Sequence, residues 1–315
     1  MGHANHPPVR ILIFGAGAIG SLIGGLLSRR NDVTLVGRKG HVAAVNRHGL
    51  KIVGKTELVA NMAATTEVPP GPFDLVLIST KAYDTPKAIS ALRPFWDSSL
   101  FLTLQNGLKN ADLISEEVRR VAAGTTSHGV TFVADGLVRH AGLGDTRIGP
   151  FKNVSAREAR MLCDEMTACG FPANPSDDIR RDLWVKVLVN ASINPITAIA
   201  RVQNGRLLTM PQLNTLLRMS SVEGATVARS EGYAISNGHA ISAAEKVAKR
   251  TAENRSSMLQ DIERGRRTEI AEISGAIIEV ARSHGIAVPV VDTIRLSVGL
   301  LERRSGGQVS RSEDD

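Results

Sequence analysis

The chain has 315 residues, enough for one large domain or two domains of ordinary size. Hydrophobic residues make up 43% of it and charged residues 22%, a globular composition that excludes a disordered chain. The formal net charge is +7, but only 3% of the residues are aromatic and no long basic run is present. This pattern argues against nucleic-acid binding and favours a small anionic substrate together with a phosphate-rich cofactor.

Cysteine content and apolar runs indicate the compartment. The two cysteines, Cys163 and Cys169, make neither a disulfide framework nor a metal site, so we expect a reducing environment and no metal. No apolar run reaches the length of a membrane span, and residues 1–8 lack the apolar core of a signal peptide. We therefore expect a cytoplasmic protein with no membrane partner.

In the first half of the chain, short apolar runs alternate with helical segments. This alternation predicts an α/β fold with a Rossmann-type, doubly wound parallel sheet. The expected strands cover residues 9–14, 33–36, 75–79 and 100–104, with helices at 19–27 and 155–169. Between residues 124 and 149, glycines separate three shorter β-like pieces (129–133, 137–140 and 146–148), which we expect to be antiparallel strands that close the sheet.

Strand patterns disappear after about residue 177, and helical patterns begin near residues 183, 212, 240, 268 and 290. The change follows Asn174-Pro175-Ser176-Asp177, which has the composition of a linker. We therefore predict a Rossmann-type domain over residues 1–177, an all-helical domain over 178–303 that contributes substrate binding and catalysis, and a tail at 304–315 that frays.

A glycine-rich turn directly follows the first expected strand and opens the first expected helix. Its residues, Gly15-Ala16-Gly17-Ala18-Ile19-Gly20, have the GxGxxG spacing of dinucleotide sites. Gly15 permits the tight turn, Gly17 lets a pyrophosphate approach the backbone, and Gly20 lets helix and strand pack closely. Because the helix N-terminus then offers free N–H groups to phosphates, the sequence predicts a bound dinucleotide.

Residues at later strand ends indicate which dinucleotide binds. Enzymes that bind NAD usually place Asp or Glu after the second strand, but this chain has Gly37-Arg38-Lys39 there. Arg38 suits a 2′-phosphate, so NADP(H) is favoured over NAD(H). Lys81 and Asn106 each follow a later strand, where ligands of such sheets bind. Lys81 either contacts the cofactor or is solvated, and Asn106 either binds cofactor ribose or substrate or only forms a turn.

The segment from Leu183 to Pro195 is apolar or small at most positions. Lys186, Asn190 and Asn194 interrupt it at intervals of four residues. On a helix they fall within an arc of about 80° over roughly 12 Å of its axis. A helix apolar on its other faces is buried, and buried polar groups without partners cost several kcal/mol. The stripe therefore predicts one wall of a ligand site, unless it is simply the wet side of the helix.

A second polar segment runs from Ser256 to Ile270. Glu269 opens an amphipathic helix near its end. Thr268 could cap that helix while Glu269 complements the helix dipole. Local sequence does not separate this structural role from a chemical one.

Together these motifs resemble the ketopantoate reductase family (2-dehydropantoate 2-reductase, of the ApbA/PanE type). The resemblance runs nearly end to end. It comprises the GxGxxG turn, Lys81, the Gln105-Asn106-Gly107 turn, the Trp184-x-Lys186 helix with both asparagines, and the two segments Ser256–Asp261 and Thr268-Glu269-Ile270. One departure is Ala271, where family members often have Asp after Thr-Glu-Ile. That change removes none of the roles assigned below.

The resemblance implies NADPH-dependent reduction of 2-dehydropantoate to (R)-pantoate, in the biosynthesis of pantothenate and coenzyme A. It assigns Lys186 as the general acid and Glu269 as the residue that completes the catalytic centre. It makes Asn106, Asn190, Asn194 and Ser257 the substrate ligands. Glu269 either keeps Lys186 protonated or binds the substrate hydroxyl. Two alternatives stay open, a related NADP-dependent reductase of another small 2-oxo acid and a non-catalytic dinucleotide-binding regulator, as does a homodimer formed through the helical half.

Overall fold

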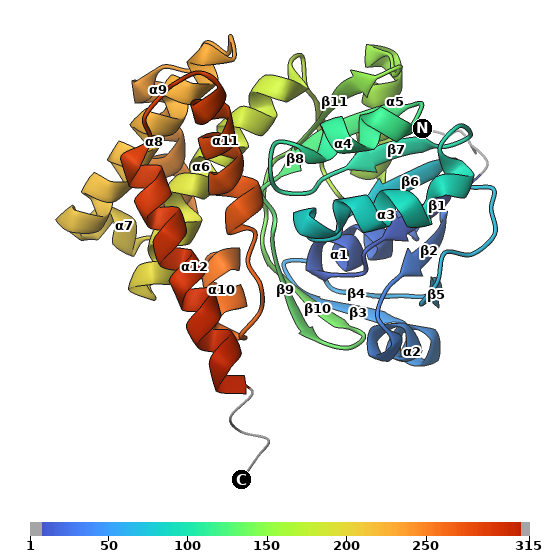
Figure 1. Ribbon diagram of the computed structural model, residues 1–315. Coiled ribbons are helices and arrows are strands. Elements are labelled where there is room, and N and C mark those ends of the chain that lie inside the picture. The colour runs from blue at the N-terminus through green and yellow to red at the C-terminus, as the bar shows by residue number, and fades with distance from the viewer. Residues whose placement is uncertain (1–7, 310–315) are drawn as a thin grey trace. The chain divides into compact units, whose positions relative to one another are not determined.

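The computed structural model describes residues 8–309, which divide into two units (Figure 1). Unit 1 takes in the chain up to Gln105 and then Asn110–Asp182, and unit 2 takes in Asn106–Lys109 and the chain from Leu183 onward. The chain thus enters unit 2 for four residues, returns, and crosses finally inside helix α6 (Ile179–Ala200). Within the expected linker, Asn174–Pro175 form the edge strand β12.

Unit 1 is built on an eight-stranded sheet with the order β12-β11-β8-β7-β6-β1-β2-β5. Its strands are β1 (Arg10–Phe14), β2 (Asp32–Val36), β5 (Ala63–Thr65), β6 (Leu75–Ile78), β7 (Leu100–Thr103), β8 (Val121–Thr126), β11 (Thr146–Lys152) and β12. Every neighbouring pair is parallel except β8 and β11. The predicted Rossmann-type fold is therefore confirmed.

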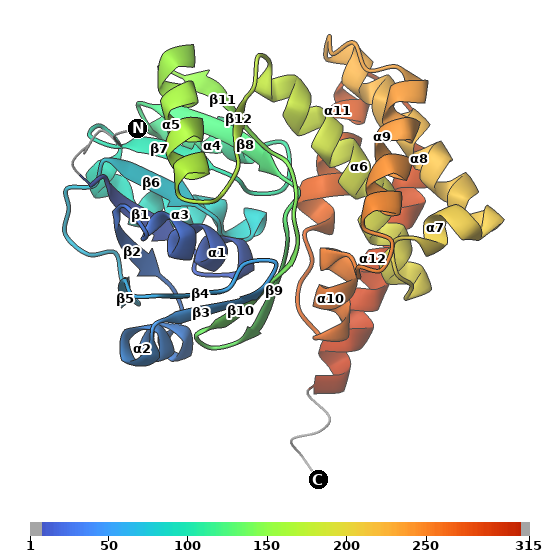
Figure 2. The same ribbon diagram turned by 180° about the vertical axis from the view of Figure 1, so that it is seen from behind.

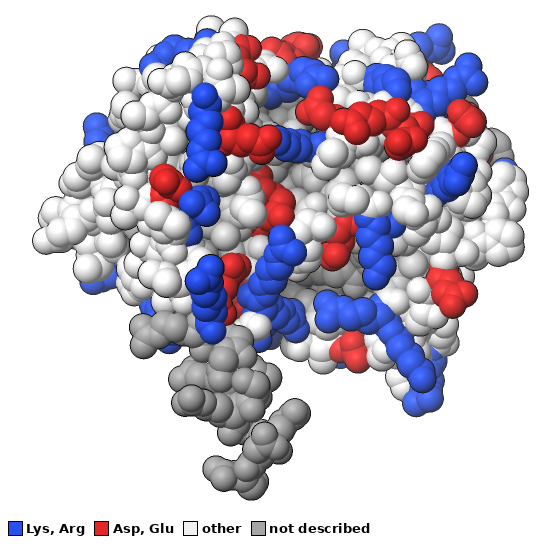
Figure 3. All heavy atoms as spheres, in the orientation of Figure 1, with Lys and Arg blue, Asp and Glu red and all other residues white. Residues whose placement is uncertain are grey.

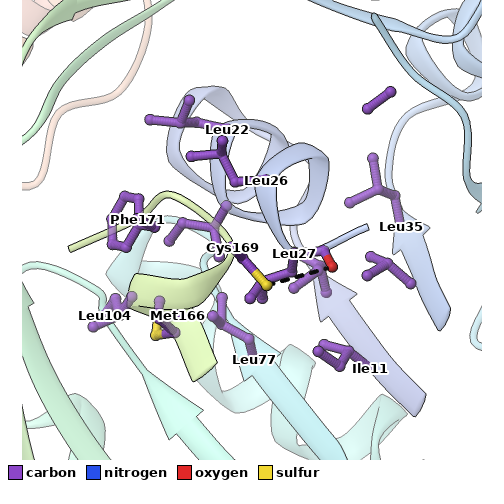
Figure 4. Packing of buried hydrophobic residues seen from close by; sticks show 14 of the residues in the cluster. Ile11, Leu22, Leu26, Leu27, Leu35, Leu77, Leu104, Met166, Cys169 and Phe171 are labelled. Atoms are coloured by element: carbon purple, nitrogen blue, oxygen red, sulfur yellow. Dashed lines mark hydrogen bonds between the residues drawn. The ribbon is translucent and has the colours of Figure 1, made fainter. Parts of the chain in front are cut away.

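Alternate side chains of the central strands face opposite layers of helices. Ile11 and Ile13 pack in one apolar cluster with α1 (Ala18–Leu27) and α5 (Ala156–Ala168), as Figure 4 shows in part. Leu12 packs in another cluster with α3 (Thr85–Ala91) and α4 (Asn110–Glu117). Figures 1 and 2, seen from opposite sides, show these two layers. Because both faces are covered, the strands read as continuous apolar runs rather than alternating ones.

A second sheet of unit 1 corrects one expectation. Its order is β4-β3-β10-β9, from β3 (Leu50–Gly54), β4 (Leu58–Ala60), β9 (Gly129–Ala134) and β10 (Leu137–Gly142). Only β11 closes the main sheet in antiparallel fashion, whereas β9 and β10 pair with each other and β10 pairs with β3. The reason is burial, because Leu50, Ile52 and Val138 lie in the same apolar cluster as α1. That helix is consequently buried along most of its length.

Helix α2 (Lys39–His48) follows β2 directly and contacts β5. Its first residues, Lys39 and Gly40, are exposed, while His41, Val42 and Val45 are buried. The side chains of Arg47 and His48 lie in its last turn, where they complement the negative helix end. The helix therefore presents its N-terminal turn at the carboxyl end of β2, the edge at which ligands of such sheets bind.

The described part of unit 2 contains helices and no strand, so the predicted all-helical character of the second half is confirmed. Its helices are α6, α7 (Arg206–Thr209), α8 (Pro211–Ser230), α9 (Asn237–Arg250), α10 (Ser257–Glu263), α11 (Ala276–Ser283) and α12 (Pro289–Val309). Trp184, Val187 and Leu188 of α6 belong to one apolar cluster, and Val189 and Ile193 belong to another. Helix α12 continues past the expected boundary at 303, and residues 310–315 of the expected tail lie outside the described residues.

Helix α6 is also long and apolar enough to cross a membrane by length and composition, and no other helix among residues 8–309 is. Of its most apolar window, 72% is buried against other parts of the protein. A helix buried in this way has the character of a core helix rather than of a lipid-exposed one. Its hydropathy therefore reflects its central place in unit 2.

The exposed charges are mixed in sign. On the face shown in Figure 3, Lys and Arg side chains alternate with Asp and Glu side chains rather than gathering in one basic field. Several of the protein's exposed charges pair, for example Arg180 with Asp112 at 3.0 Å and Arg218 with Glu245 at 2.6 Å. Exposed pairs of this kind contribute little to stability, on the order of 0–1 kcal/mol each.

Candidate active site

The glycine turn between β1 and α1 has the shape of a phosphate cradle. Gly15 has φ +109°, and a Cβ there would lie 2.6 Å from the backbone nitrogen of Thr80. A Cβ on Gly20 would lie 2.2 Å from the carbonyl oxygen of Gly15. A Cβ on Gly17, by contrast, would meet no atom within 4 Å. The protein's own packing thus demands the outer two glycines, and the middle one borders open space, which fits a bound pyrophosphate.

The other expected cofactor residues of unit 1 lie at the same edge of the sheet. Phe14, the last residue of β1, is in register with Val36 of β2 and Ile78 of β6, so the segments that follow these strands are neighbours. Arg38 is exposed, and its side chain makes no hydrogen bond or ion pair with residues 8–303. Lys81 precedes a 3₁₀ turn, Ala82–Asp84, at the end of β6. The structure therefore brings the glycine turn, Arg38 and Lys81 to one edge.

Gln105 fixes the ends of β6 and β7 to each other. Its side chain is 6% exposed, and its Nε2 donates to the carbonyl oxygen of Thr80 at 3.1 Å and to Oγ1 of Thr85 at 2.9 Å. Ser79 Oγ donates to the Gly15 carbonyl oxygen at 2.9 Å. These bonds tie the turn that carries Lys81 to the glycine turn. The sequence analysis noted Gln105 only as part of a turn, because its hydrogen bonds depend on strand order.

Lys186 and Glu269 lie close together within unit 2. Lys186 is partly buried on α6, and Glu269 is only 5% exposed. Burial lowers the pKa of Lys186 from 10.5 to about 8, and the negative charge of Glu269 opposes that shift. Burial penalises the charged ammonium, while a nearby carboxylate favours it. The pair therefore leaves an ammonium that is protonated at neutral pH yet ready to release its proton.

Asn106 reaches Glu269 across a long interval of sequence. Its Nδ2 donates to Glu269 Oε2 at 3.0 Å, and both residues belong to unit 2. The bond fixes the orientation of the carboxylate beside Lys186. Asn106 was expected to bind substrate or cofactor ribose, and the structure adds this second partner. No local pattern could have shown it, because the two residues are far apart in the chain.

The backbone around Glu269 is unusual. Thr268 Oγ1 accepts a hydrogen bond from Ile270 N at 3.2 Å, as the capping interpretation expects, and Glu302 of α12 accepts one from Thr268 N at 2.7 Å. A π-helical turn, Ala271–Gly275, follows at once. Such turns are rare and frequently occur at functional sites. Capping and a chemical role for Glu269 are thus compatible.

The remaining expected residues differ in exposure. Asn190 is partly buried and Asn194 is 9% exposed, so the α6 stripe is not simply a wet surface. Ser257 is exposed at the first position of α10. Its neighbour Ser256 is buried, caps α10 by accepting from Leu259 N at 3.1 Å, and accepts from Thr197 Oγ1 of α6 at 2.8 Å. Ser256 therefore anchors the start of α10 to α6, a role the sequence analysis missed.

Two family models match this chain. The family model described as ketopantoate reductase PanE/ApbA matches residues 11–153, and that of its C-terminal part matches residues 178–300. The chain belongs to the ketopantoate reductase PanE/ApbA family. The resemblance drawn from the sequence motifs is therefore confirmed, and the chain is an oxidoreductase of a dinucleotide-dependent family.

Relatives of this ketopantoate reductase family member cover nearly all of its length. The chain is 39% identical to the 2-dehydropantoate 2-reductase of Halobacterium salinarum, over 94% of this chain and 99% of the relative. It is 37% identical to that of Archaeoglobus fulgidus, over 90% and 95%.

Solved structures of similar proteins share the fold. A PanE/ApbA family ketopantoate reductase from Ralstonia eutropha has a TM-score of 0.85 at 31% identity, over 94% of this chain and 99% of that one. A D-mandelate dehydrogenase, solved with NADH and anilino(oxo)acetate, has a TM-score of 0.89 at 27% identity, over 94% and 98%. The same fold thus carries more than one 2-oxo acid chemistry.

Proposed function

We propose that the protein is an NADPH-dependent 2-dehydropantoate 2-reductase, which reduces 2-dehydropantoate to (R)-pantoate for pantothenate and coenzyme A biosynthesis in the cytoplasm. Relatives of that name at 39% and 37% identity over nearly the whole chain support the reaction. The observation that carries the chemistry is the Lys186–Glu269 pair, in which burial and the nearby Glu269 charge give the partly buried Lys186 a pKa of about 8. A proton donor for a developing alkoxide needs this property.

The residues of unit 1 fit a dinucleotide, and Arg38 supports the phosphorylated form. The open space at Gly17 and the uncapped start of α1 suit a pyrophosphate. The Arg38 side chain has no partner among residues 8–303 and lies where the adenosine ribose binds in such folds, so it is available to pair with a 2′-phosphate. The reduced nicotinamide, when bound, supplies the hydride for the keto carbon.

Lys186 provides the charge and the proton for the other half of the reaction. As the keto carbon is reduced, negative charge grows on the carbonyl oxygen, and the Lys186 ammonium stabilises that charge and then donates its proton. Glu269 favours the protonated form of Lys186, and Asn106 holds the Glu269 carboxylate in place. This geometry favours the role of Glu269 on Lys186 over a role on the substrate hydroxyl.

We assign the holding of substrate to Asn190, Asn194 and Ser257. Asn190 and Asn194 continue the line of Lys186 along α6, and their amides can donate to a carboxylate or accept from a hydroxyl. Ser257 is exposed, and the bond of the adjacent Ser256 to Thr197 links its segment to α6. A small hydroxylated 2-oxo acid matches this mixture of donors and acceptors.

A second candidate is another 2-oxo acid reductase that uses NADH. The similarity to a D-mandelate dehydrogenase solved with NADH and anilino(oxo)acetate favours it. Rates of NADPH and NADH oxidation with 2-dehydropantoate, branched aliphatic 2-oxo acids and aryl 2-oxo acids separate the two. We expect the highest kcat/KM with NADPH and 2-dehydropantoate. A higher kcat/KM for an aryl 2-oxo acid with NADH would replace the proposed function with the second candidate.

A further inference from the structure

Unit 1 contains a buried histidine that the proposed reaction does not use. His41 lies in the first turn of α2, shortly after Arg38, and is only 2% exposed. Its Nε2 lies 3.0 Å from Ser21 Oγ on α1, and its Nδ1 accepts a hydrogen bond from Gly136 N at 2.9 Å. One ring therefore joins the helix of the glycine turn, the helix that follows Arg38, and the turn between β9 and β10.

These partners determine the protonation state of His41. A backbone N–H can only donate, so Nδ1 carries no proton and the neutral ring donates to Ser21 from Nε2. Burial lowers the pKa of His41, the charge of Arg38 lowers it further, and the charge of Asp135 raises it. Helix α1 and strand β9, which pack against the ring, contain no charged residue, so the charges of Asp135 and Arg38 are the ones that act on it.

The bond to Gly136 places a carboxylate on the first turn of α2. Gly136 has φ +73°, and a Cβ there would lie 2.9 Å from the Cβ of Ala44, so the β9–β10 turn lies directly on α2. The preceding residue is Asp135, and a Cβ on Gly40 would lie 2.1 Å from its Oδ2. The Asp135 side chain makes no hydrogen bond or ion pair with residues 8–303. An acid that the end of β2 lacks is thus supplied by a distant turn.

We propose that His41 is a positioning residue of the dinucleotide site, which holds Asp135 beside the Arg38 turn and thereby sets the balance between NADPH and NADH. The proposal rests on the proposed function, in which the adenosine ribose binds at the end of β2. There a carboxylate accepts hydrogen bonds from ribose hydroxyls and repels a 2′-phosphate, whereas Arg38 attracts the phosphate. Asp135 therefore moderates the preference for NADPH that Arg38 creates.

Binding titrations of NADPH and NADH to the full-length protein and its variants test this inference. We expect Asp135→Asn to raise the ratio of NADPH to NADH affinity by roughly two- to fivefold, the range of an exposed charge interaction. His41→Leu, which removes the acceptor for Gly136 N, should raise the ratio in the same direction, and the double variant should add nothing further. His41→Asn, whose Oδ1 can replace Nδ1 as the acceptor, should keep the wild-type ratio.

A second readout covers the case in which His41→Leu does not fold. Protonation of His41 removes its acceptor, so as the pH falls below 6.5 the wild-type ratio should move toward that of Asp135→Asn. The His41→Asn variant should lack this pH-dependent change of the ratio. Because the 2′-phosphate of NADPH titrates equally in both proteins, the difference between wild type and His41→Asn reports His41 alone. An unchanged ratio of NADPH to NADH affinity in Asp135→Asn would overturn the inference. So would a His41→Leu variant that loses both affinities equally, if wild type and His41→Asn also show the same pH dependence. If wild type binds neither dinucleotide, the proposed function fails, and this inference fails with it.

Discussion

At the scale of single residues, the proposed chemistry depends on a lysine whose burial disfavours its charged form. Lys186 is a charged group on a helix whose other residues build two apolar clusters. Its type and spacing marked it in the sequence. The Asn106–Glu269 bond did not appear there, because it joins segments separated by most of the fold. Candidate residues on one element could be named from their type and spacing, whereas their contacts with residues of another element could not.

Replacement of Lys186 tests its role as the general acid. We expect Lys186→Ala to lower kcat for 2-dehydropantoate reduction by roughly 10²- to 10⁴-fold, the usual contribution of a positioned acid. The Kd for the dinucleotide should stay within about twofold of wild type, because the glycine turn belongs to unit 1. Steady-state assays and fluorescence titration measure the two quantities. Wild-type turnover in this variant would remove Lys186 from the mechanism.

The pKa of Lys186 sets the alkaline limb of the reaction. Because an acid must be protonated to act and this pKa is about 8, we expect kcat for reduction to fall as the pH rises through about 8. Glu269→Gln removes the charge that raises the pKa, so the limb should shift to lower pH in that variant. A pH–rate series from 6 to 10 on both proteins measures this. If the pH at which kcat falls stays the same or rises in Glu269→Gln, Glu269 does not raise the pKa of Lys186.

At the scale of elements, regular patterns were more predictable than short ones. The segment β1–glycine turn–α1 followed from an apolar run, its glycine spacing and the helix after it. Strands β3 and β4 are only five and three residues long, too short to show a clear period, so the second sheet was missed and β9 and β10 were assigned to the wrong sheet. The π-helical turn after Glu269 also has no signature, because its five residues would suit an ordinary helix equally well.

Two glycines of the same turn offer a matched test of what the turn is for. We expect Gly17→Ala to leave the melting temperature near that of wild type, since a Cβ there meets no protein atom within 4 Å, but to weaken dinucleotide binding by roughly tenfold or more. Gly20→Ala should lower the melting temperature as well, because its Cβ would lie 2.2 Å from a backbone oxygen. Thermal unfolding and binding titrations on both variants measure this. Unchanged dinucleotide binding in Gly17→Ala would show that the pyrophosphate does not bind at this turn.

At the scale of the whole molecule, the two-part organisation was visible as a change of pattern, but its borders were not. A single border near residue 177 follows naturally from composition. The structure instead assigns Asn106–Lys109 to the helical unit and divides the chain again within α6. Composition averages over many residues, so it cannot reveal a four-residue segment that belongs to the other unit.

Buried histidines make the stability of the protein depend on pH. Burial lowers the pKa of both His41 and His140 from the ordinary 6.5. Below that value the unfolded chain binds protons that the folded protein does not, so the free energy of unfolding should decrease as the pH falls from 6.5 and should be insensitive to these groups above it. Melting temperatures between pH 5 and 8 measure the effect. A His140→Asn variant should show a shallower dependence, and an equal or steeper one would show that other groups cause it.

The four-residue segment Asn106–Lys109 limits how far the two halves are interchangeable. Within unit 2, Asn106 bonds Glu269, Leu108 packs against the apolar cluster around Trp184, and Lys109 pairs with Glu279. A helical half that begins inside α6 and is joined to a foreign nucleotide-binding domain would therefore lack the Asn106 side chain that bonds Glu269. The two halves therefore cannot be exchanged independently. A hybrid protein has to include the loop after β7 together with the helices, or the foreign nucleotide-binding domain has to provide an equivalent loop.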